Sequence, residues 1–551
     1  MAGPIVETAA GRLRGLEQEG GFAFLGVPYA TVPDDAELAR FGPPAPPAPW
    51  SGVRDAQSFG PIAPQIAIGP ASLLSSDGLA QGEEPRNLNV WTPACDDGRR
   101  PVLVFIHGGA FSGGTGSSSL YRGDRLCRRG VVVVTFNYRL GALGFLSHPA
   151  LEHPGAPVNG NYGLQDQIAA LGWVRRHAAV FGGDPGNITV FGESAGAMSV
   201  CALLGAPGAR GLFRRAVIQS GMAFAHRAPL AHRLAEDLCA RLGIGAPSRR
   251  ALVALPSDEL LAAQHACNRE VDEGMGMPFA PVVDGTLLAR HPADLIADGA
   301  GSPEVAVLAG TNRDEFTMFS LAASLPRDLD RSALEALVGR YLVSSGRADL
   351  PDPAAVVDLY ERERAGRGDA ATARALLDAF GTDWIFRVPL TRMLEAHGRH
   401  GAPTFCYRFD WPSPFGGGAL GACHGIELPF VFGTLADPVV SLFTGAGEDA
   451  LALADQIQSA WVAFATSGDP THPGIGPWPT YEPVRRSTLV LGAGAPSVVE
   501  APAEAERAFL DAALGRYGEG DARARTLAFL APDGDTTVRG ENGGPPGAAG
   551  T

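Results

Sequence analysis

The stretch Phe191-Gly192-Glu193-Ser194-Ala195-Gly196 decides how this chain folds around its functional site. Residues 187–191 are mostly β-branched or apolar and predict a strand, whereas the small residues of 195–200 predict a helix. A serine between a strand and a helix, in a G-x-S-x-G pattern, stands on a sharp turn that leaves its hydroxyl clear of the backbone. Side chains would clash at that turn, which accounts for the flanking glycines. A chain with 72 Gly can also contain this pattern by chance, so the nucleophile hypothesis for Ser194 depends on its surroundings.

Short apolar runs between turn residues predict the strands of a sheet. They lie at 102–106, 131–136, 188–191, 216–218 and 305–309. Between them, apolar residues recur at helical spacing, at Leu164, Ile168, Leu171, Val174 and Ala178. This alternation is typical of an α/β fold with a large, mostly parallel sheet and helices on both faces, whose active site lies at the carboxyl ends of the strands. The Gly- and Pro-rich residues 1–60 predict an antiparallel edge.

The domain organisation predicted from the sequence is one catalytic domain, 1–516, followed by a tail. Residues from about 321 to 400 favour helix, and we expect them to form a cap-like insertion over the site. Residues 517–551 are rich in Gly, Pro and Asp and predict a disordered segment.

Composition excludes several classes of function. The net charge of -15 argues against nucleic-acid and anionic-membrane partners. Lysine is absent and all 44 basic residues are arginine, which excludes Schiff-base, S-x-x-K and phosphate-loop lysine chemistry. Seven scattered cysteines, and a start without a signal-peptide pattern, indicate reduced thiols in the cytoplasm. We expect no metal, no cofactor, no membrane span, and a monomer or a weak homo-oligomer.

A serine hydroxyl needs a base, usually a histidine oriented by a carboxylate, and in this architecture the chain order is Ser, Asp/Glu, His. The downstream candidates are His397, His400, His424 and His472. The first two end a polar helix and His472 lies in a surface turn, where solvation is the simpler interpretation. His424 lies in a loop after a predicted strand, 405–409, where a mobile base belongs.

The acid should follow a strand, and the run 305–309 is followed by Asp314 and Glu315. Either carboxylate could serve, and Arg313 could pair with the other. Backbone donors for an oxyanion are expected in the loop after an early strand. The run 106–111, I-H-G-G-A-F, has this position, and its small residues permit close approach to a substrate. The donors predicted there and after the nucleophile are the amides of Gly109, Ala110 and Ala195.

Together these residues resemble the type-B carboxylesterase family of α/β-hydrolases, which includes bacterial para-nitrobenzyl esterases and cholinesterases. The resemblance covers residues 5 to 500. Its motifs are G-V-P-Y-A at 26–30, W-S-G-V-R-D-A at 50–56, N-Y-G-L-Q-D-Q at 161–167 and the long nucleophile signature at 181–196. The resemblance implies that the acid is Glu315 and the base His424. It also implies that Ser220 supports the acid, although a packed strand-end hydroxyl is the alternative.

This chain departs from the family pattern in two places. The motif E-D-C-L-x-L-N-V appears as E-E-P-R-N-L-N-V at 83–90, so Pro85 replaces the cysteine of the usual disulfide. No tryptophan occurs in 66–82, where cholinesterase-like members hold their cation-binding ring, so cationic choline esters are poor candidates. Cys423 beside the base is interpreted as a small packed residue. Expected pocket residues are Phe224, Met318 and Phe319.

The sequence therefore predicts a serine carboxylesterase that hydrolyses small-molecule esters through an acyl-enzyme intermediate. One alternative keeps the triad and changes the substrate to a thioester, carbamate or amide in a biosynthetic pathway. Another is a catalytically inactive scaffold relative, although such members typically lose the serine or the histidine, and this chain retains both.

Overall fold

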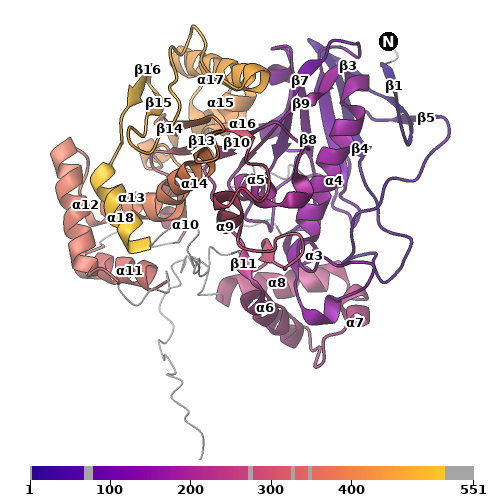
Figure 1. The fold of residues 1–551 in the computed structure, drawn as a ribbon, viewed down its shortest axis with the longest axis horizontal. Coiled ribbons are helices and arrows are strands. Elements are labelled where there is room, and N and C mark those ends of the chain that lie inside the picture. Colours follow the sequence, from indigo (N-terminus) through magenta and orange to yellow (C-terminus); the bar gives the residue numbers. More distant parts are fainter. Residues whose placement is uncertain (1–2, 67–77, 271–276, 324–328, 345–349, 515–551) are drawn as a thin grey trace, which may run out of the picture.

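A single large sheet organises the molecule. The computed structural model describes residues 3–66, 78–270, 277–323, 329–344 and 350–514. Within them the sheet has 11 strands in the order β16-β15-β14-β13-β10-β9-β7-β8-β6-β4-β3 (Figure 1). Their bounds are β3 (Leu16–Gln18), β4 (Gly21–Pro28), β6 (Asn87–Thr92), β7 (Arg100–Ile106), β8 (Val132–Phe136), β9 (Gly183–Glu193), β10 (Arg215–Gln219), β13 (Ala306–Asn312), β14 (Thr404–Phe409), β15 (Thr488–Gly492) and β16 (Gly494–Val499).

The pairing confirms a mostly parallel sheet with an antiparallel N-terminal edge. The strands from β8 to β15 pair in parallel, and β8-β6, β6-β4, β4-β3 and β15-β16 pair antiparallel. Two small sheets lie outside it, formed by β1 (Ile5–Thr8), β2 (Gly11–Arg14) and β5 (Val53–Asp55), and by β11 (His226–Arg227) and β12 (Val282–Val283).

Two of the strands, β9 and β13, extend by three or more residues beyond one end of their apolar runs. β9 begins at Gly183, five residues before the predicted run, because Arg100 of β7 pairs with Gly183 across a register shift. β13 continues to Asn312, because its ladder with β14 extends to the pair Asn312–Phe409. Both extensions contain glycine and polar residues, so they are not part of an apolar run in the sequence.

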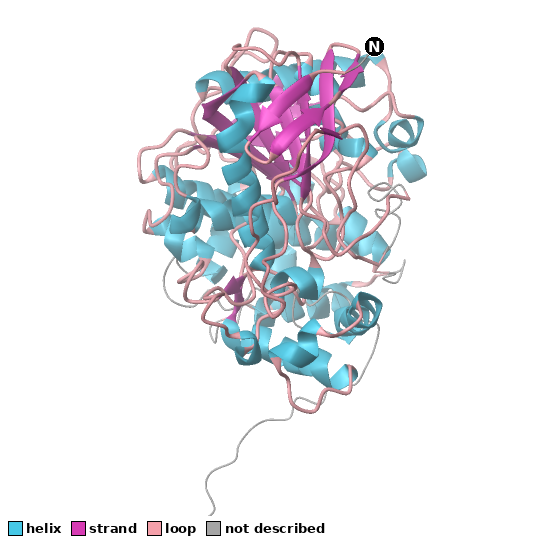
Figure 2. Ribbon diagram, turned by 90° about the vertical axis from the view of Figure 1, so that its right-hand side faces the viewer, coloured by secondary structure: helices cyan, strands magenta, loops and turns pink. Residues whose placement is uncertain are grey.

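Helices cover both faces of the sheet. Their bounds are α2 (Asp124–Cys127), α3 (Gly141–Phe145), α4 (Tyr162–His177), α5 (Ala195–Gly205), α6 (Ala228–Arg241), α7 (Arg249–Val253), α8 (Ser257–Glu270), α9 (Pro292–Ala297), α10 (Thr317–Ala322), α11 (Arg331–Ser344), α12 (Pro353–Arg367), α13 (Ala373–Thr382), α14 (Val388–Gly398), α15 (Leu428–Phe432), α16 (Pro438–Thr444), α17 (Glu448–Ser467) and α18 (Glu504–Leu514). Figure 2 shows the strands of the large sheet gathered towards one end of the molecule, with mostly helices and loops, and only short strands, towards the other.

Side chains that alternate in direction along the central strands contribute to two hydrophobic cores, one on each face of the sheet. Successive side chains of a strand point to opposite faces. Val102 and Val104 of β7 therefore join a core that includes α4 and α5, whereas Leu103 and Phe105 join a second core that includes α15 and α17. All four side chains are fully buried, which explains why a strand covered on both faces reads as a continuous apolar run.

The helical stretch predicted for 321–400 contains α11 to α14. A π-helical turn, Asp383–Arg387, joins α13 to α14. Within the described residues, no helix combines the length and apolar character that a membrane span requires. The tail predicted for 517–551 lies outside the described residues.

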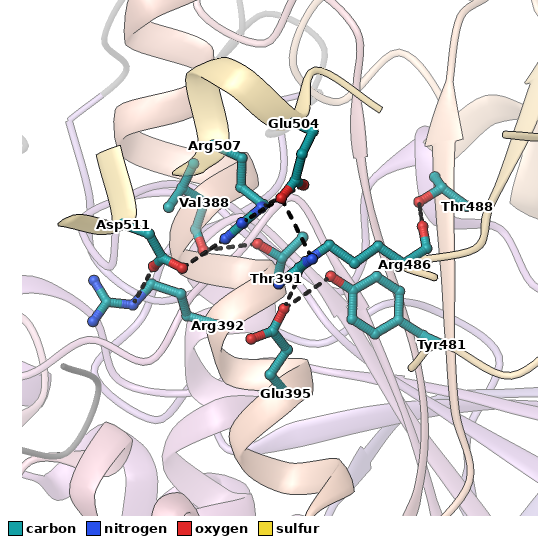
Figure 3. Close-up of polar contacts among 10 residues, drawn as sticks. All are labelled: Val388, Thr391, Arg392, Glu395, Tyr481, Arg486, Thr488, Glu504, Arg507 and Asp511. Carbon is teal, nitrogen blue, oxygen red and sulfur yellow. Dashed lines mark hydrogen bonds and ion pairs between the residues drawn. The ribbon is translucent and has the colours of Figure 1, made fainter. Parts of the chain in front are cut away.

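The last described helix, α18, is attached to α14 by a network of ion pairs (Figure 3). Arg507 on α18 contacts Glu504 at 2.7 Å and Asp511 at 2.6 Å on the same helix. Asp511 lies 3.2 Å from Arg392 of α14. Arg486, which precedes β15, contacts Glu395 of α14 at 3.0 Å and Glu504 of α18 at 3.5 Å. The network alternates cations and carboxylates, so it fixes α18 on the body of the fold.

Candidate active site

Ser194 stands on the predicted turn between β9 and α5. Its backbone has φ 55° and ψ −123°, a conformation in which most side chains are strained. A Cβ at Gly196 would lie 2.0 Å from the carbonyl oxygen of Ile106, and one at Gly192 would lie 2.5 Å from the carbonyl carbon of Gly196. Both flanking glycines are therefore required by close backbone approach, and the half-buried serine is presented at the carboxyl end of β9.

The loop after β7 lies against this turn. A Cβ at Gly108 would come within 3.1 Å of the Cβ of Ser194, so the loop can approach the serine only without a side chain there. Gly109 and Ala110 follow with φ of 108° and 53°. Ala195 is the first residue of α5, and the amide of a first helical residue has no acceptor within its own helix. The loop after β7 and the start of α5 therefore both lie beside the serine turn.

His424 and Glu315 are brought together from loops after different strands. Glu315 follows β13 and His424 follows β14, and the Nδ1 of His424 lies 2.7 Å from Oε2 of Glu315. The other Glu315 oxygen accepts the backbone amide of Asn312 at 2.7 Å. Asp314 is oriented elsewhere: it pairs with Arg313 at 2.9 Å and accepts the amide of Ala422 at 2.8 Å. The spacing in the sequence did not distinguish Asp314 from Glu315. In the structure, Glu315 is the carboxylate of this pair that contacts His424.

The other candidate histidines have structural partners. Nε2 of His397 lies 2.7 Å from the carbonyl oxygen of Val305. Nε2 of His400 lies 3.0 Å from that of Ile296, and Nε2 of His472 lies 2.9 Å from that of Gln456. Each nitrogen satisfies a backbone carbonyl of a neighbouring segment.

Two more buried carboxylates surround His424. Oε1 of Glu193, the residue before the serine, lies 3.1 Å from Nε2 of His424. Glu427, one helical turn after the histidine, accepts hydrogen bonds from Asn312 at 2.7 Å and from Gln219 at 3.1 Å. Among the described residues, Nε2 of His424 makes this close contact with Glu193 but forms no hydrogen bond.

This arrangement shifts the acid–base properties of the site. Burial lowers the pKa of His424, but the negative charges of Glu193 and Glu315 outweigh burial and raise it to about 9. Burial and the neighbouring carboxylates Glu427 and Glu315 raise the pKa of Glu193 to about 8, against the opposing effect of His424. Burial and Glu315 raise the pKa of Glu427 too. His424, Glu193 and Glu427 therefore keep their protons up to a higher pH than isolated histidine and glutamate side chains would.

Aromatic rings enclose the histidine. The rings of Phe319 and Phe386 have their centroids 5.1 Å and 5.0 Å from that of His424. Of the predicted pocket residues, Phe319 thus lies at the site. Phe224 is buried against His226, with ring centroids 5.2 Å apart, and Met318 packs against the second hydrophobic core.

Two predicted neighbours of the acid are buried. The Oγ of Ser220 has no hydrogen-bond partner among the described residues, so it does not bond Glu315 in this structure. Cys423 is fully buried, burial raises the pKa of its thiol, and its carbonyl accepts a hydrogen bond from Asn312 at 2.8 Å. It behaves as a packed residue and positions the histidine loop through its backbone.

Sequence reasoning missed Glu193, Glu427, Phe386 and Asn312 as members of the site. Glu193 and Glu427 had a local signal, since one is adjacent to the serine and the other follows the histidine by three residues. Phe386 had none, because the π-helical turn that presents it looks like ordinary helix in the sequence.

Comparison with known proteins agrees with this geometry. The family model described as "Carboxylesterase family" matches residues 2–509. The chain belongs to the carboxylesterase family. It is a carboxylic ester hydrolase with the α/β-hydrolase fold, as its relatives and structural neighbours are.

Three esterases illustrate the likeness. The chain is 37% identical over 505 residues to the para-nitrobenzyl esterase of Bacillus subtilis, covering 89% of this chain and 95% of that one. It is 36% identical over 484 residues to the fumonisin B1 esterase of Sphingopyxis macrogoltabida, covering 86% and 84%. The crystal structure of carboxylesterase EST55 from Geobacillus stearothermophilus superposes with a TM-score of 0.79 at 39% identity, covering 92% of this chain and 99% of that one.

Proposed function

We propose that Ser194, His424 and Glu315 are the catalytic triad of this carboxylesterase. The observation that supports the proposal is the 2.7 Å contact between Nδ1 of His424 and Glu315. The other ring nitrogen, Nε2, lies 3.1 Å from the carboxylate of Glu193, the residue that precedes the serine. A carboxylate on Nδ1 fixes the tautomer whose Nε2 can accept a proton.

In the proposed reaction, Oγ of Ser194 attacks the ester carbonyl carbon while Nε2 of His424 takes the hydroxyl proton. The amides of Gly109, Ala110 and Ala195 stabilise the oxyanion of the tetrahedral intermediate. The intermediate collapses, the C–O bond to the alcohol breaks, and Nε2 returns the proton to the leaving oxygen. Water, deprotonated by the same histidine, then attacks the acyl-enzyme, and a carboxylate and free serine result.

The supporting roles are also part of the proposal. Glu315 stabilises the imidazolium, and Ser220 acts behind it as buried strand-end packing. Phe319 lines the substrate pocket beside His424, a role supported by its ring contact, and we assign Met318 and Phe224 to more distant parts of the pocket.

We further propose one catalytic domain that includes the helices of 321–400, and a monomer or weak homo-oligomer in the cytoplasm, where the seven free cysteines would remain reduced.

The experiment compares the parent enzyme with Ser194→Ala on a para-nitrophenyl ester, with labelling by a fluorophosphonate as a second readout. We expect kcat to fall by about 10⁴-fold or more and labelling to disappear. Ser220→Ala is the matched control, because it removes a nearby buried hydroxyl and should remain labelled. Near-parental hydrolysis by Ser194→Ala would refute the assignment. A panel of esters that varies acyl and alcohol size then defines the substrate class.

A further inference from the structure

One buried glutamine holds the loop after β7 from outside. Oε1 of Gln65 accepts a hydrogen bond from the backbone amide of Gly114 at 2.8 Å, and Nε2 of Gln65 donates to the carbonyl of Gly114 at 3.0 Å. The same Nε2 donates to the carbonyl of Ala63 at 3.0 Å, and Gln65 is 8% exposed. Gln65 belongs to the segment between β5 and β6. A side chain from another part of the chain therefore binds both backbone polar groups of Gly114.

A second glutamine fixes the backbone of Gln65. The amide of Gln65 donates to Oε1 of Gln81 at 2.8 Å, and Nε2 of Gln81 donates to the carbonyl of Gln65 at 3.0 Å. Nearby, the amide of Gly82 donates to the carbonyl of Ile62 at 3.0 Å. The side chain of Gln65 thus reaches the loop from an anchored position.

The loop adopts a backbone conformation that needs such support. Four of its residues have a positive φ: Gly109 (108°), Ala110 (53°), Phe111 (57°) and Gly114 (96°). A positive φ is strained for Ala110 and Phe111, and strained residues persist only where the surrounding structure holds them. The carbonyl of Phe111 accepts the amide of Gly141 at 2.6 Å, which holds the middle of the loop. Gln65 holds its end.

The end of the loop lies directly against its beginning. A Cβ at Gly114 would lie 2.4 Å from the carbonyl oxygen of Gly108, and one at Gly109 would lie 2.3 Å from that of Gly113. The amide of Gly113 also donates to the carbonyl of Gly109 at 2.9 Å. Such close packing transmits displacements. A shift of Gly114 therefore moves Gly108, whose own close contact is with Ser194.

We propose that Gln65 is a positioning residue for ester hydrolysis: its hydrogen bonds to Gly114 hold the amides of Gly109 and Ala110 where the oxyanion forms. The role rests on the proposed function, in which these two amides are oxyanion donors. Such donors act only when they are already oriented toward the developing charge. A glutamine suits this task because its amide carries an acceptor and donors on one end, so one side chain fixes both the N–H and the C=O of Gly114.

The test compares Gln65→Met with the parent enzyme, because methionine has a similar length but cannot form the two bonds to Gly114. We expect kcat for a para-nitrophenyl ester to fall by about 10- to 100-fold, with KM changed by less than about twofold, since the bonds act on the transition state. Gln57→Met is the matched control. It makes the same substitution earlier in the segment, breaks a 3.0 Å hydrogen bond to the carbonyl of Gly15, and should behave like the parent.

Two inhibitors distinguish positioning of the loop from a general loss of structure. Ser194 attacks an alkyl trifluoromethyl ketone: a C–O bond forms, His424 takes the hydroxyl proton, and the ketone oxygen becomes an oxyanion, as in hydrolysis. The matching methyl ketone forms this adduct far less and reports binding of the uncharged carbonyl. The inhibition constant of the trifluoromethyl ketone should rise in Gln65→Met by the factor by which kcat falls, whereas that of the methyl ketone should not change.

Gln81→Ala keeps the proposal falsifiable if Gln65→Met does not fold. Its side chain is exposed, and loss of its two bonds to the backbone of Gln65 should reproduce the same pattern at about fivefold. Unchanged kcat in these variants, or equal rises of both inhibition constants, would overturn the proposal. Ser194→Ala is measured beside them. If it is inactive while Gln65→Met equals the parent, the role of Gln65 alone is refuted; an active Ser194→Ala would refute the proposed function itself.

Discussion

Nε2 of His424 lies 3.1 Å from Oε1 of Glu193, while Nδ1 of the same ring contacts Glu315. The imidazole is thus placed between two buried carboxylates, which raise its pKa to about 9 against the effect of burial. A base must be unprotonated to accept the serine proton. In the proposed mechanism Glu315 orients the ring for that task, whereas Glu193 favours the protonated ring and opposes it in the free enzyme. This opposition gives the site a measurable pH dependence.

Glu193→Gln should move the acid limb of the pH profile of kcat/KM to lower pH by about one unit, the size of shift caused by one nearby charge. The sign follows from charge: without the Glu193 carboxylate the imidazolium is less stable, so the ring becomes neutral at lower pH. The kcat/KM profile reports the free enzyme, where this contact is seen. Glu17→Gln on β3 removes an exposed carboxylate and should leave the limb in place. An unshifted limb in Glu193→Gln would show that Glu193 does not govern the base.

The sequence predicts those parts of the structure that a single local requirement determines. The serine turn could be predicted because backbone approach excludes side chains at Gly192 and Gly196, and the buried strands could be predicted because both their faces are apolar. The carboxylate cluster could not be predicted, since Glu193, Glu315 and Glu427 converge only through the order of the strands. Spacing alone gives Asp314 and Glu315 the same signal. The family resemblance favours Glu315, and the loop conformation places Glu315 against His424.

Glu315→Gln should lower kcat by about 10⁴-fold, since an amide can hold the ring in the wrong tautomer, as in other triads. Asp314→Asn is the matched control: it changes the neighbouring carboxylate, which bonds Ala422 and Arg313, not the histidine. Its kcat should stay within about tenfold of the parent. Steady-state kinetics on one ester measures both. Larger loss in Asp314→Asn than in Glu315→Gln would reverse the assignment of the acid.

Gly108→Ala tests the close contact between the loop after β7 and the serine. Its Cβ would lie 2.8 Å from the carbonyl oxygen of Glu193 and 3.1 Å from the Cβ of Ser194, so the loop must move away. We expect kcat to fall by about 10²–10³-fold, the cost of losing an oxyanion donor. Gly113→Ala is the control in the same loop, because its nearest neighbour would be 3.4 Å away. Equal kcat values for the two variants would exclude this loop from the reaction.

Arg507→Met tests the ion pairs within α18 that hold Glu504 and Asp511 in place for Arg486 and Arg392 (Figure 3). Arg507 is 9% exposed, and its guanidinium donates to Glu504 and Asp511 at 2.6 to 2.8 Å. Removing a buried donor to charged acceptors should lower the free energy of unfolding by about 2 kcal/mol. Arg485→Met removes an exposed pair with Glu500 and should leave the melting temperature unchanged, because solvent screens such pairs. Calorimetry measures the melting temperature of both variants. We expect kcat/KM to be unchanged in each, which would show that the network has a structural role and not a catalytic one. Equal melting temperatures of the two variants would mean that α18 is held instead by its apolar face, which includes the fully buried Leu510.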